Sequence, residues 1–196
     1  MFVKTTDKTV RFYTANNFTD ISMKEEYATT FSYTEEEIER YFTRYIINVV
    51  RKGGITRDEY ITKIRKWYGG YRFSPSGDTV YSPLSIGSFF TGGGNKFTAY
   101  RNREVPEPVR DALKQAGTGE SGISLERILN SDISTGADCI PLLFQTGYLT
   151  IQSSMPVRGS RLLTLGYPNM ETEMTAGEIT ACVQIGGWLS SMLNVL

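Results

Sequence analysis

The segment Trp67–Ile86 contains the residue types best suited to binding a ligand, and its sequence is WYGGYRFSPSGDTVYSPLSI. One arginine, Arg72, follows the glycine pair Gly69 and Gly70. Around it the chain carries a dense set of aromatic side chains, which we call the aromatic block. They are Trp67, Tyr68, Tyr71, Phe73 and Tyr81. Aromatic rings beside cations are the groups that stack on nucleic-acid bases and bind phosphates.

Two interpretations of the aromatic block follow from the residues. In the first, the rings belong to the core: those before the glycines end a helix, and those after them pack in a hairpin. In the second, the rings form a stacking platform for nucleic acid, and basic side chains bind the phosphates. These side chains are Arg72, Lys63, Arg65 and Lys66. The balance of 21 basic and 21 acidic residues favours the structural interpretation, although it is compatible with a local basic face.

A phosphate-binding P-loop requires the pattern Gly-x-x-x-x-Gly-Lys-Ser/Thr between a buried strand and a helix. Gly117 and Gly122 have the required separation, but Ile123 occupies the lysine position. Lys96, in the segment GGGNKFT, has no glycine directly before it. We therefore interpret both segments as flexible loops.

Histidine is absent from the sequence, which removes Ser–His and Cys–His nucleophilic pairs and the commonest zinc ligand. We expect no catalytic residue and no metal site in this chain. Cys139 and Cys182 could form one disulfide, but two buried thiols in a reducing compartment are the favoured interpretation. The N-terminus does not resemble a signal peptide, and no run of about 18 apolar residues exists. We expect a soluble, cytoplasmic protein that does not bind membranes.

Capping boxes mark two consecutive helices, one at Thr34–Glu37 and the other at Thr56–Glu59. Apolar residues recur at helical spacing after each box, and the pairs Gly53–Gly54 and Gly69–Gly70 end the helices. The sequence therefore predicts two antiparallel helices joined by a tight turn. Another helix begins at Ser82–Pro83.

Two hairpins complete the expected architecture, which is mainly α-helical with two β-hairpins (α+β). In the first, YRF and VY flank the turn SPSGDT; in the second, YLTIQ and RLLTL flank a polar connection. The second hairpin follows a helix in ADCIPLLFQ, an order typical of a winged helix. Arg158 and Arg161 would then lie on the wing and contact phosphates. The preceding helix is too apolar for a DNA groove and is better suited to burial.

Four segments, in order along the chain, carry a further pattern. They are NNFTDISMKEEYATTFSYTEEEIERYF, WYGGYRFSPSGDTVYSPLSI, IPLLFQTGYLTI and LTLGYPNMETEM. Together they resemble the second half of the AAA-ATPase-like proteins that usually carry a PD-(D/E)XK nuclease-like domain at their C-terminus. The resemblance spans about residues 16–175, whereas residues 98–136 and the final ACVQIGGWLSSMLNVL depart from the family pattern.

In that family the P-loop lies upstream of the resembling part, and the nuclease-like domain lies downstream. The resemblance therefore implies a helical lid and a winged-helix-like part, with Mg-ATP bound only by a full-length protein. It also implies that Arg72 faces the nucleotide phosphates, and that Gly69 and Gly70 permit close backbone approach. A nuclease site needs Asp/Glu-x-Lys on a strand, and no strand-like segment of this sequence carries it.

These observations divide the chain into three parts. Residues 1–96 form an N-terminal strand, a helical pair and the aromatic hairpin; residues 97–136 form a divergent flexible connection; residues 137–196 form the winged-helix-like part with a C-terminal helix. We expect a non-catalytic lid or regulatory segment of an AAA-ATPase-like protein, unable to hydrolyse ATP alone, whose partner is an ATPase core domain or another protein. The alternative is a standalone protein- or DNA-binding winged-helix-like module.

Overall fold

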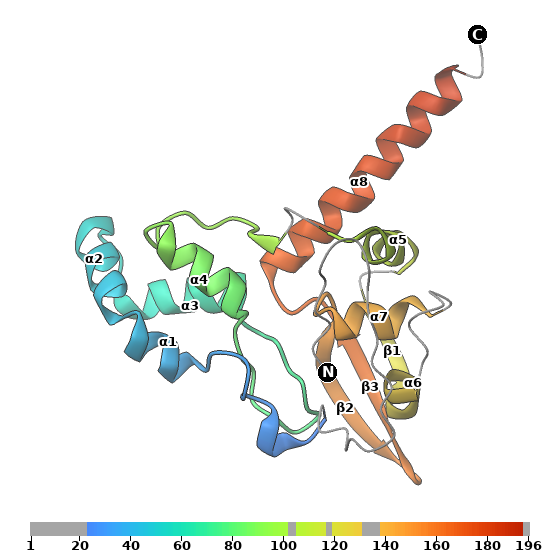
Figure 1. Cartoon of the computed structure of the whole chain (residues 1–196), viewed down its shortest axis with the longest axis horizontal. Helices are drawn as coiled ribbons and strands as arrows, with labels where there is room; N and C mark the ends of the chain where they lie inside the picture. Colours follow the sequence, from blue (N-terminus) through green and yellow to red (C-terminus); the bar gives the residue numbers. More distant parts are fainter. Residues whose placement is uncertain (1–22, 102–104, 117–118, 131–137, 194–196) are drawn as a thin grey trace.

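The computed structural model of the chain describes residues 23–101, 105–116, 119–130 and 138–193. These residues form eight α-helices and one three-stranded antiparallel sheet, which confirms the predicted mainly α-helical α+β fold class (Figure 1). The strand predicted in KTVRFYTAN lies outside the described residues. Within them, no helix combines the length and the apolar character needed to cross a bilayer.

The first half of the described chain contains a short 3-10 helix, η1 (Glu25–Tyr27), and four α-helices. They are α1 (Glu35–Tyr41), α2 (Thr43–Gly53), α3 (Arg57–Tyr68) and α4 (Pro83–Thr91). Both predicted capping boxes are confirmed, because Thr34 and Thr56 each exchange two hydrogen bonds with the glutamate three residues on. Gly54 ends α2 with a φ of 63°, in the left-handed region that suits glycine.

Phe42 separates α1 from α2, where the sequence predicted one continuous helix. Its backbone angles, φ −104° and ψ 14°, interrupt the helical path. The hydroxyl of Thr43 donates to the carbonyl oxygens of Glu39 and Arg40, the latter at 3.0 Å. A threonine that bonds to the preceding turn bends a helix, and apolar spacing gives no sign of such a bond.

The second half contains the sheet and four helices. In chain order they are α5 (Glu107–Gln115), β1 (Gly119–Ser124), α6 (Leu125–Asn130), α7 (Cys139–Gln145), β2 (Thr150–Val157), β3 (Ser160–Gly166) and α8 (Met170–Leu193). The sheet order is β1-β3-β2, and the predicted hairpin is confirmed as β2 and β3. Figure 1 shows that the C-terminal part of α8 extends away from the other elements; the helix continues past Gly186–Gly187, where the sequence pattern is lost.

Strand β1 corrects the expectation that the segment GTGESGIS, which contains Gly117, Gly122 and Ile123, is only a flexible loop. Residues 119–124 pair antiparallel with β3, with an irregular register between Glu120 and Ile123. Ile123 is buried, and Gly122 has a φ of 74° within the irregularity. Because Ile123 is the only apolar residue of GESGIS, the segment has no alternation that would predict a strand.

The hairpin predicted after α3 is shorter than expected. A single antiparallel bridge joins Tyr71 to Val80, and another joins Tyr81 to Tyr33, so neither arm becomes a full strand. Beyond Tyr71 the chain turns toward β2, where the backbone of Arg72 bonds to the side chain of Thr150. Contacts with distant segments therefore replace the ladder that local turn chemistry predicts.

The described residues form two hydrophobic cores. The aromatic core lies among α1–α4, and its buried members are Ile38, Ile46, Tyr60, Ile61, Ile64, Tyr68, Tyr81, Ile86, Phe89 and Phe90. The aliphatic core lies among α5–α8 and the sheet. Its larger members include Val109, Leu113, Ile140, Leu143, Leu149, Ile151, Leu163 and Leu165.

Candidate functional site at the junction of the two cores

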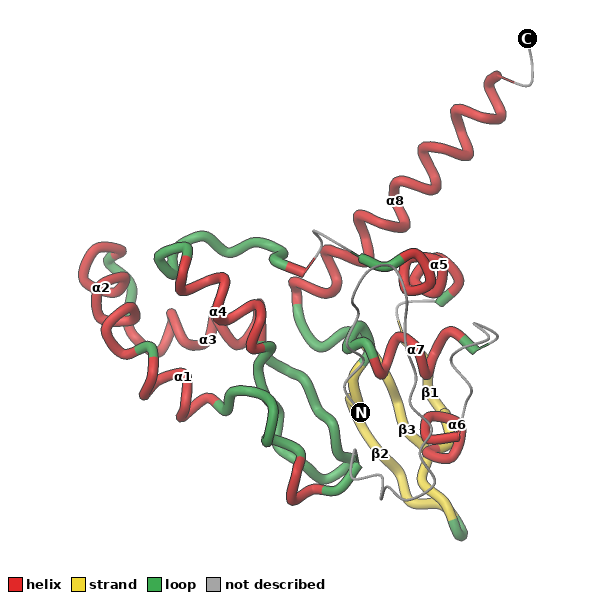
Figure 2. The backbone as a smooth tube through the Cα atoms, viewed as in Figure 1, coloured by secondary structure: helices red, strands yellow, loops and turns green. Residues whose placement is uncertain are grey.

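Buried polar contacts join the two cores, and we call this region the junction. The loops that follow α3 and α4 run from the helical side of the molecule toward the strands and the first turn of α8 (Figure 2). The residues that meet there are Gly69, Gly70, Tyr71, Arg72, Ser85, Arg101, Thr150, Pro168, Asn169, Glu171 and Thr172. Several belong to segments about 100 residues apart, so the junction is a tertiary feature.

Glu171 is the fully buried acid of the junction. Its carboxylate accepts hydrogen bonds from the Ser85 hydroxyl at 2.6 Å, the Tyr100 N–H at 2.7 Å and the Arg101 N–H at 3.3 Å. Burial raises the pKa of Glu171, and the hydrogen bonds from these donors oppose that change. Glu171 thus connects the first turn of α8 to α4 and to the loop beyond it.

Arg101 makes the second connection. Its guanidinium donates to the Tyr71 hydroxyl at 2.8 Å, to the Gly147 carbonyl at 2.9 Å and to the Thr146 carbonyl at 2.6 Å. It also lies 4.9 Å from the centre of the Tyr148 ring. One side chain therefore satisfies two carbonyl oxygens at the end of α7 and holds an aromatic residue of the first half against them.

The glycine pair contacts the segment before α8. Gly70 has a φ of 83°, and a Cβ atom there would lie 2.2 Å from the carbonyl oxygen of Pro168. The Gly69 carbonyl accepts a hydrogen bond from the Asn169 side-chain amide at 2.7 Å. The oxygen of the same amide caps α8 by accepting from the Thr172 N–H at 3.1 Å, a bond typical of Asn at a helix N-cap. Close packing of two backbones thus accounts for glycine at position 70.

Arg72 lies along the edge of β2. Its N–H donates to the Thr150 hydroxyl at 2.6 Å, and its guanidinium donates to the Gln152 carbonyl at 3.4 Å. Its Nε atom is buried and has no hydrogen-bond partner among the described residues. The nucleotide-facing role of Arg72, Gly69 and Gly70 stays a prediction.

The aromatic block supplies side chains to the aromatic core and to the junction. Tyr68, Tyr71 and Tyr81 are buried, whereas Trp67 and Phe73 are partly exposed. The Tyr68 hydroxyl donates to the Thr98 carbonyl and accepts from the Thr98 N–H, both at 3.1 Å. These are the contacts expected of core residues whose polar ends bind backbone.

The two arginines predicted to lie on a wing are distant from the junction along the hairpin. Arg158 is exposed in the turn between β2 and β3, and Arg161 donates to the Ser154 hydroxyl at 3.2 Å. The hairpin end that enters the junction is the opposite one, at Thr150. Helix α7 buries the side chains of residues 140–144, so it presents no polar face there.

Among the described residues, no group of three or more His, Cys, Asp and Glu side chains could hold a metal ion. Cys139 is a partly buried free thiol, and burial raises its pKa. Cys182 lies outside the residues whose side chains are described.

Sequence reasoning missed Arg101 and Glu171, two of the charged residues of the junction. Arg101 lies in residues 97–136, which the sequence predicted as a divergent flexible connection, and Glu171 has the sequence context of an ordinary acid in the first turn of a helix. Glu171 and Glu173 are both acids of the first turn of α8, and only the structure shows that Glu171 is buried and Glu173 exposed. Nothing local marked Arg101.

The fold and the junction define an α+β protein in which a helical half and a sheet-containing half share a buried polar contact. No protein-family model matches the sequence, and no solved structure matches it. Over an alignment of 172 positions that covers 83% of this chain, the sequence is 31% identical to a protein of Azotobacter chroococcum mcd 1 described as an uncharacterized protein in the vnfD 5' region. The match spans 30% of that protein's length.

Proposed function

We propose that this chain is a non-catalytic lid or regulatory segment of an AAA-ATPase-like protein and does not hydrolyse ATP alone. One observation supports the proposal: the two segments WYGGYRFSPSGDTVYSPLSI and LTLGYPNMETEM, which carry much of the family resemblance, contact each other in the junction. Gly70 packs on Pro168, and the side-chain hydroxyl oxygens of Tyr71 and Thr172 lie 3.4 Å apart. A lid transmits a nucleotide-dependent movement only if its parts move together, and a network of hydrogen bonds between the two segments suits that task.

In this proposal, Mg-ATP and the P-loop belong to an ATPase core that is also the partner of this chain. Similarity to 30% of a longer protein is what a segment of a larger machine would show. Arg72 faces nucleotide only if that core approaches the edge of β2, where its guanidinium lies. We place the protein in the cytoplasm, where ATP is available.

A second candidate is a DNA-binding winged-helix-like module. The exposed position of Arg158 at the tip of the hairpin favours it, since a wing contacts the phosphate backbone there. The burial of α7 disfavours it, because the helix that precedes the hairpin has no free face for a groove. The lid is therefore the function we prefer.

The first test is a titration of the purified chain with labelled Mg-ATP, with Arg72→Ala and the control Arg158→Ala beside it. The proposal predicts no saturable binding up to about 1 mM nucleotide. Binding at micromolar concentration that disappears only in Arg72→Ala would show that the chain forms a nucleotide site of its own, and the lid proposal would fail.

The second test uses the longer Azotobacter protein with its matched stretch replaced by this chain. If the proposal is right, the chimera hydrolyses Mg-ATP, and Gly70→Ala, which disturbs the junction, changes the rate. Absence of hydrolysis in both the chimera and the parent protein would contradict the proposal.

A further inference from the structure

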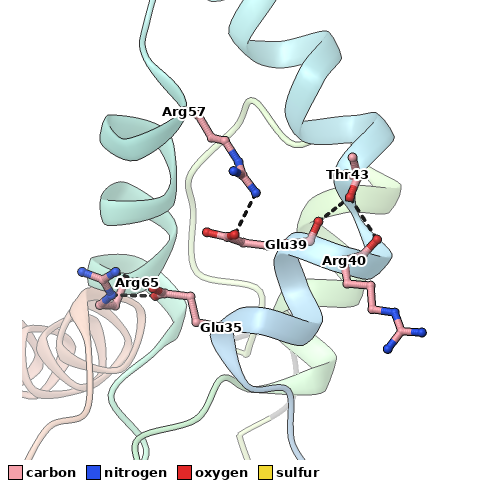
Figure 3. A network of polar contacts seen from close by, with 6 residues as sticks. All are labelled: Glu35, Glu39, Arg40, Thr43, Arg57 and Arg65. Carbon is pink, nitrogen blue, oxygen red and sulfur yellow. Dashed lines mark hydrogen bonds and ion pairs between the residues drawn. The ribbon is translucent and has the colours of Figure 1, made fainter.

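The positive charge of this neutral chain is concentrated in the helical half. Residues 40–66 contain eight basic and two acidic residues, a net charge of +6. Residues 25–39, directly before them, contain six acids and no basic residue. Two of the eight basic residues are paired with acids of α1: Arg57 with Glu39 at 2.7 Å, and Arg65 with Glu35 at 2.6 Å (Figure 3). The other six basic residues make no ion pair with a described residue, although Lys63 lies 4.5 Å from the centre of the Phe97 ring.

Four of these remaining cations share one face of the α1–α2 segment with two tyrosines, and we call it the basic face. Its members are Arg40, Tyr41, Arg44, Tyr45, Arg51 and Lys52. They recur at helical spacing on the side opposite the buried Ile38 and Ile46, and all six are exposed. No acid interrupts the face. None of its cations makes an ion pair with a described residue, and Figure 3 shows Arg40 pointing away from the two ion pairs of α1.

Helix stability explains only part of this arrangement. Arg40 and Arg44 are like charges on either side of the break at Phe42, so their repulsion stabilises neither helix. Arg44 also lies in the first turn of α2, where the helix dipole disfavours a cation. Arg40 in the last turn of α1, and Arg51 and Lys52 in the last turn of α2, lie where the dipole favours positive charge. An ordinary solvated helix face would carry side chains of both positive and negative charge.

The rings of the two tyrosines pack against other aromatic rings of the protein and are also partly exposed to solvent. Tyr41 is 58% exposed while its ring makes an edge contact with Tyr33; Tyr45 is 45% exposed while its ring packs on Phe42 and Phe90. Fixed rings flanked by arginines are the groups on which successive bases of a single strand stack, with the phosphates on the cations. Ile47 is the only large exposed apolar residue of α2 besides Tyr45, too little for insertion into a lipid surface.

We propose that the basic face binds single-stranded nucleic acid, through phosphate contacts to its arginines and lysine and stacking on Tyr41 and Tyr45. This site is separate from the junction and from the wing. It does not depend on the lid function proposed above.

The test is a fluorescence-anisotropy titration of the full chain with a labelled oligo(dT) of about 20 nucleotides, at about 50 and about 200 mM salt. The wild type is expected to bind, with affinity that falls steeply as salt rises. Arg44→Glu/Arg51→Glu is expected to weaken binding about tenfold or more and to flatten the salt dependence. Tyr41→Leu/Tyr45→Leu is expected to weaken binding about fivefold or more and to leave the salt slope unchanged.

Arg158→Glu/Arg161→Glu is the matched control, since it changes the net charge equally at the wing. Equal loss in both charge-reversal variants, or loss in the wing variant alone, would overturn the proposal. So would the absence of wild-type binding at low salt, or tighter binding to duplex DNA or to vesicles of anionic lipid than to the single strand. Circular dichroism of each variant separates lost binding from lost folding, and Arg44→Gln/Arg51→Gln provides a milder replacement if the reversal variant does not fold.

Discussion

The two cores of this protein are built from different side chains. In the aromatic core five of the ten buried hydrophobic residues are aromatic, whereas in the aliphatic core only two of seventeen are. All three buried tyrosines of the aromatic core form hydrogen bonds through their hydroxyls. Tyr60 donates to the Gly94 carbonyl, Tyr68 bonds to Thr98, and Tyr81 donates to the Glu35 carboxylate at 2.5 Å.

This difference shows how each half fixes its loops. Tyrosine hydroxyls tie the aromatic core to the glycine-rich loop after α4 and to the start of α1, so the core itself positions those segments. The aliphatic core has no comparable set of hydroxyls; it is held by burial and by the hydrogen bonds of the sheet. In the junction, which contains the buried acid Glu171 and the partly buried Arg101, these two kinds of contact occur together.

The largest effect is expected where the backbones of the two halves touch. Gly70→Ala places a methyl group 2.2 Å from the Pro168 carbonyl at a φ of 83°, and we expect a loss of at least about 3 kcal/mol in the free energy of unfolding. Gly159→Ala is the matched control: its φ is 74°, but nothing lies within 4 Å of the added atom. It should cost only about 1 kcal/mol. Equal losses in urea denaturation would show that the close approach is unimportant.

The hydroxyls of the aromatic core should have a smaller, measurable effect. Tyr68→Phe leaves both the N–H and the carbonyl of Thr98 without their partner, so we expect a loss of about 1–2 kcal/mol. Tyr41→Phe, at an exposed ring, should change stability by less than about 0.5 kcal/mol. If the two variants are equally stable in thermal or urea unfolding, the hydroxyls do not position the loop.

Much of the local structure could be predicted because its causes are local. The capping boxes at Thr34 and Thr56 and the Asn169 cap depend on residues three positions apart, and all three are present. The cap of Asn169 was predictable, but its second bond, to the Gly69 carbonyl, was not, because that partner is 100 residues away. The junction as a whole shares this property, and so does β1, whose pairing depends on β3.

The junction should make stability depend on pH. Burial raises the folded-state pKa of Glu171 above its unfolded value, so the folded protein binds more protons between the two values and stability falls as pH rises through them. Glu171→Gln lacks this contribution. The wild type should therefore gain stability relative to the variant as pH is lowered from about 7 toward 4.5, the ordinary value. Glu173→Gln controls for the lost charge; a difference between wild type and Glu171→Gln that stays constant with pH would contradict the assignment.

The smallest effect is expected at the exposed ion pair of the aromatic core. Arg65→Gln removes the bidentate bond to Glu35 shown in Figure 3, and because both side chains are partly exposed to solvent we expect a loss below about 1 kcal/mol that shrinks in high salt. Hydrogen bonding from Arg65 lowers the pKa of Glu35, so this contribution should disappear as pH falls through that lowered pKa. A loss of stability in Arg65→Gln that depends on neither salt concentration nor pH would indicate that Arg65 acts through packing.

The claim that the junction makes one unit of the two cores can be tested most directly by hydrogen–deuterium exchange in mild urea. Peptides from α3 report on the aromatic core, and peptides from β2 and β3 report on the aliphatic core. In the wild type we predict that both exchange through the same global opening. In Arg101→Ala, which leaves the Thr146 and Gly147 carbonyls unpaired and removes one of the two partners of the Tyr71 hydroxyl, the two sets should separate, whereas the partly exposed control Arg110→Ala should behave as wild type. Cores that already open independently in the wild type, or that still open together in Arg101→Ala, would contradict the claim.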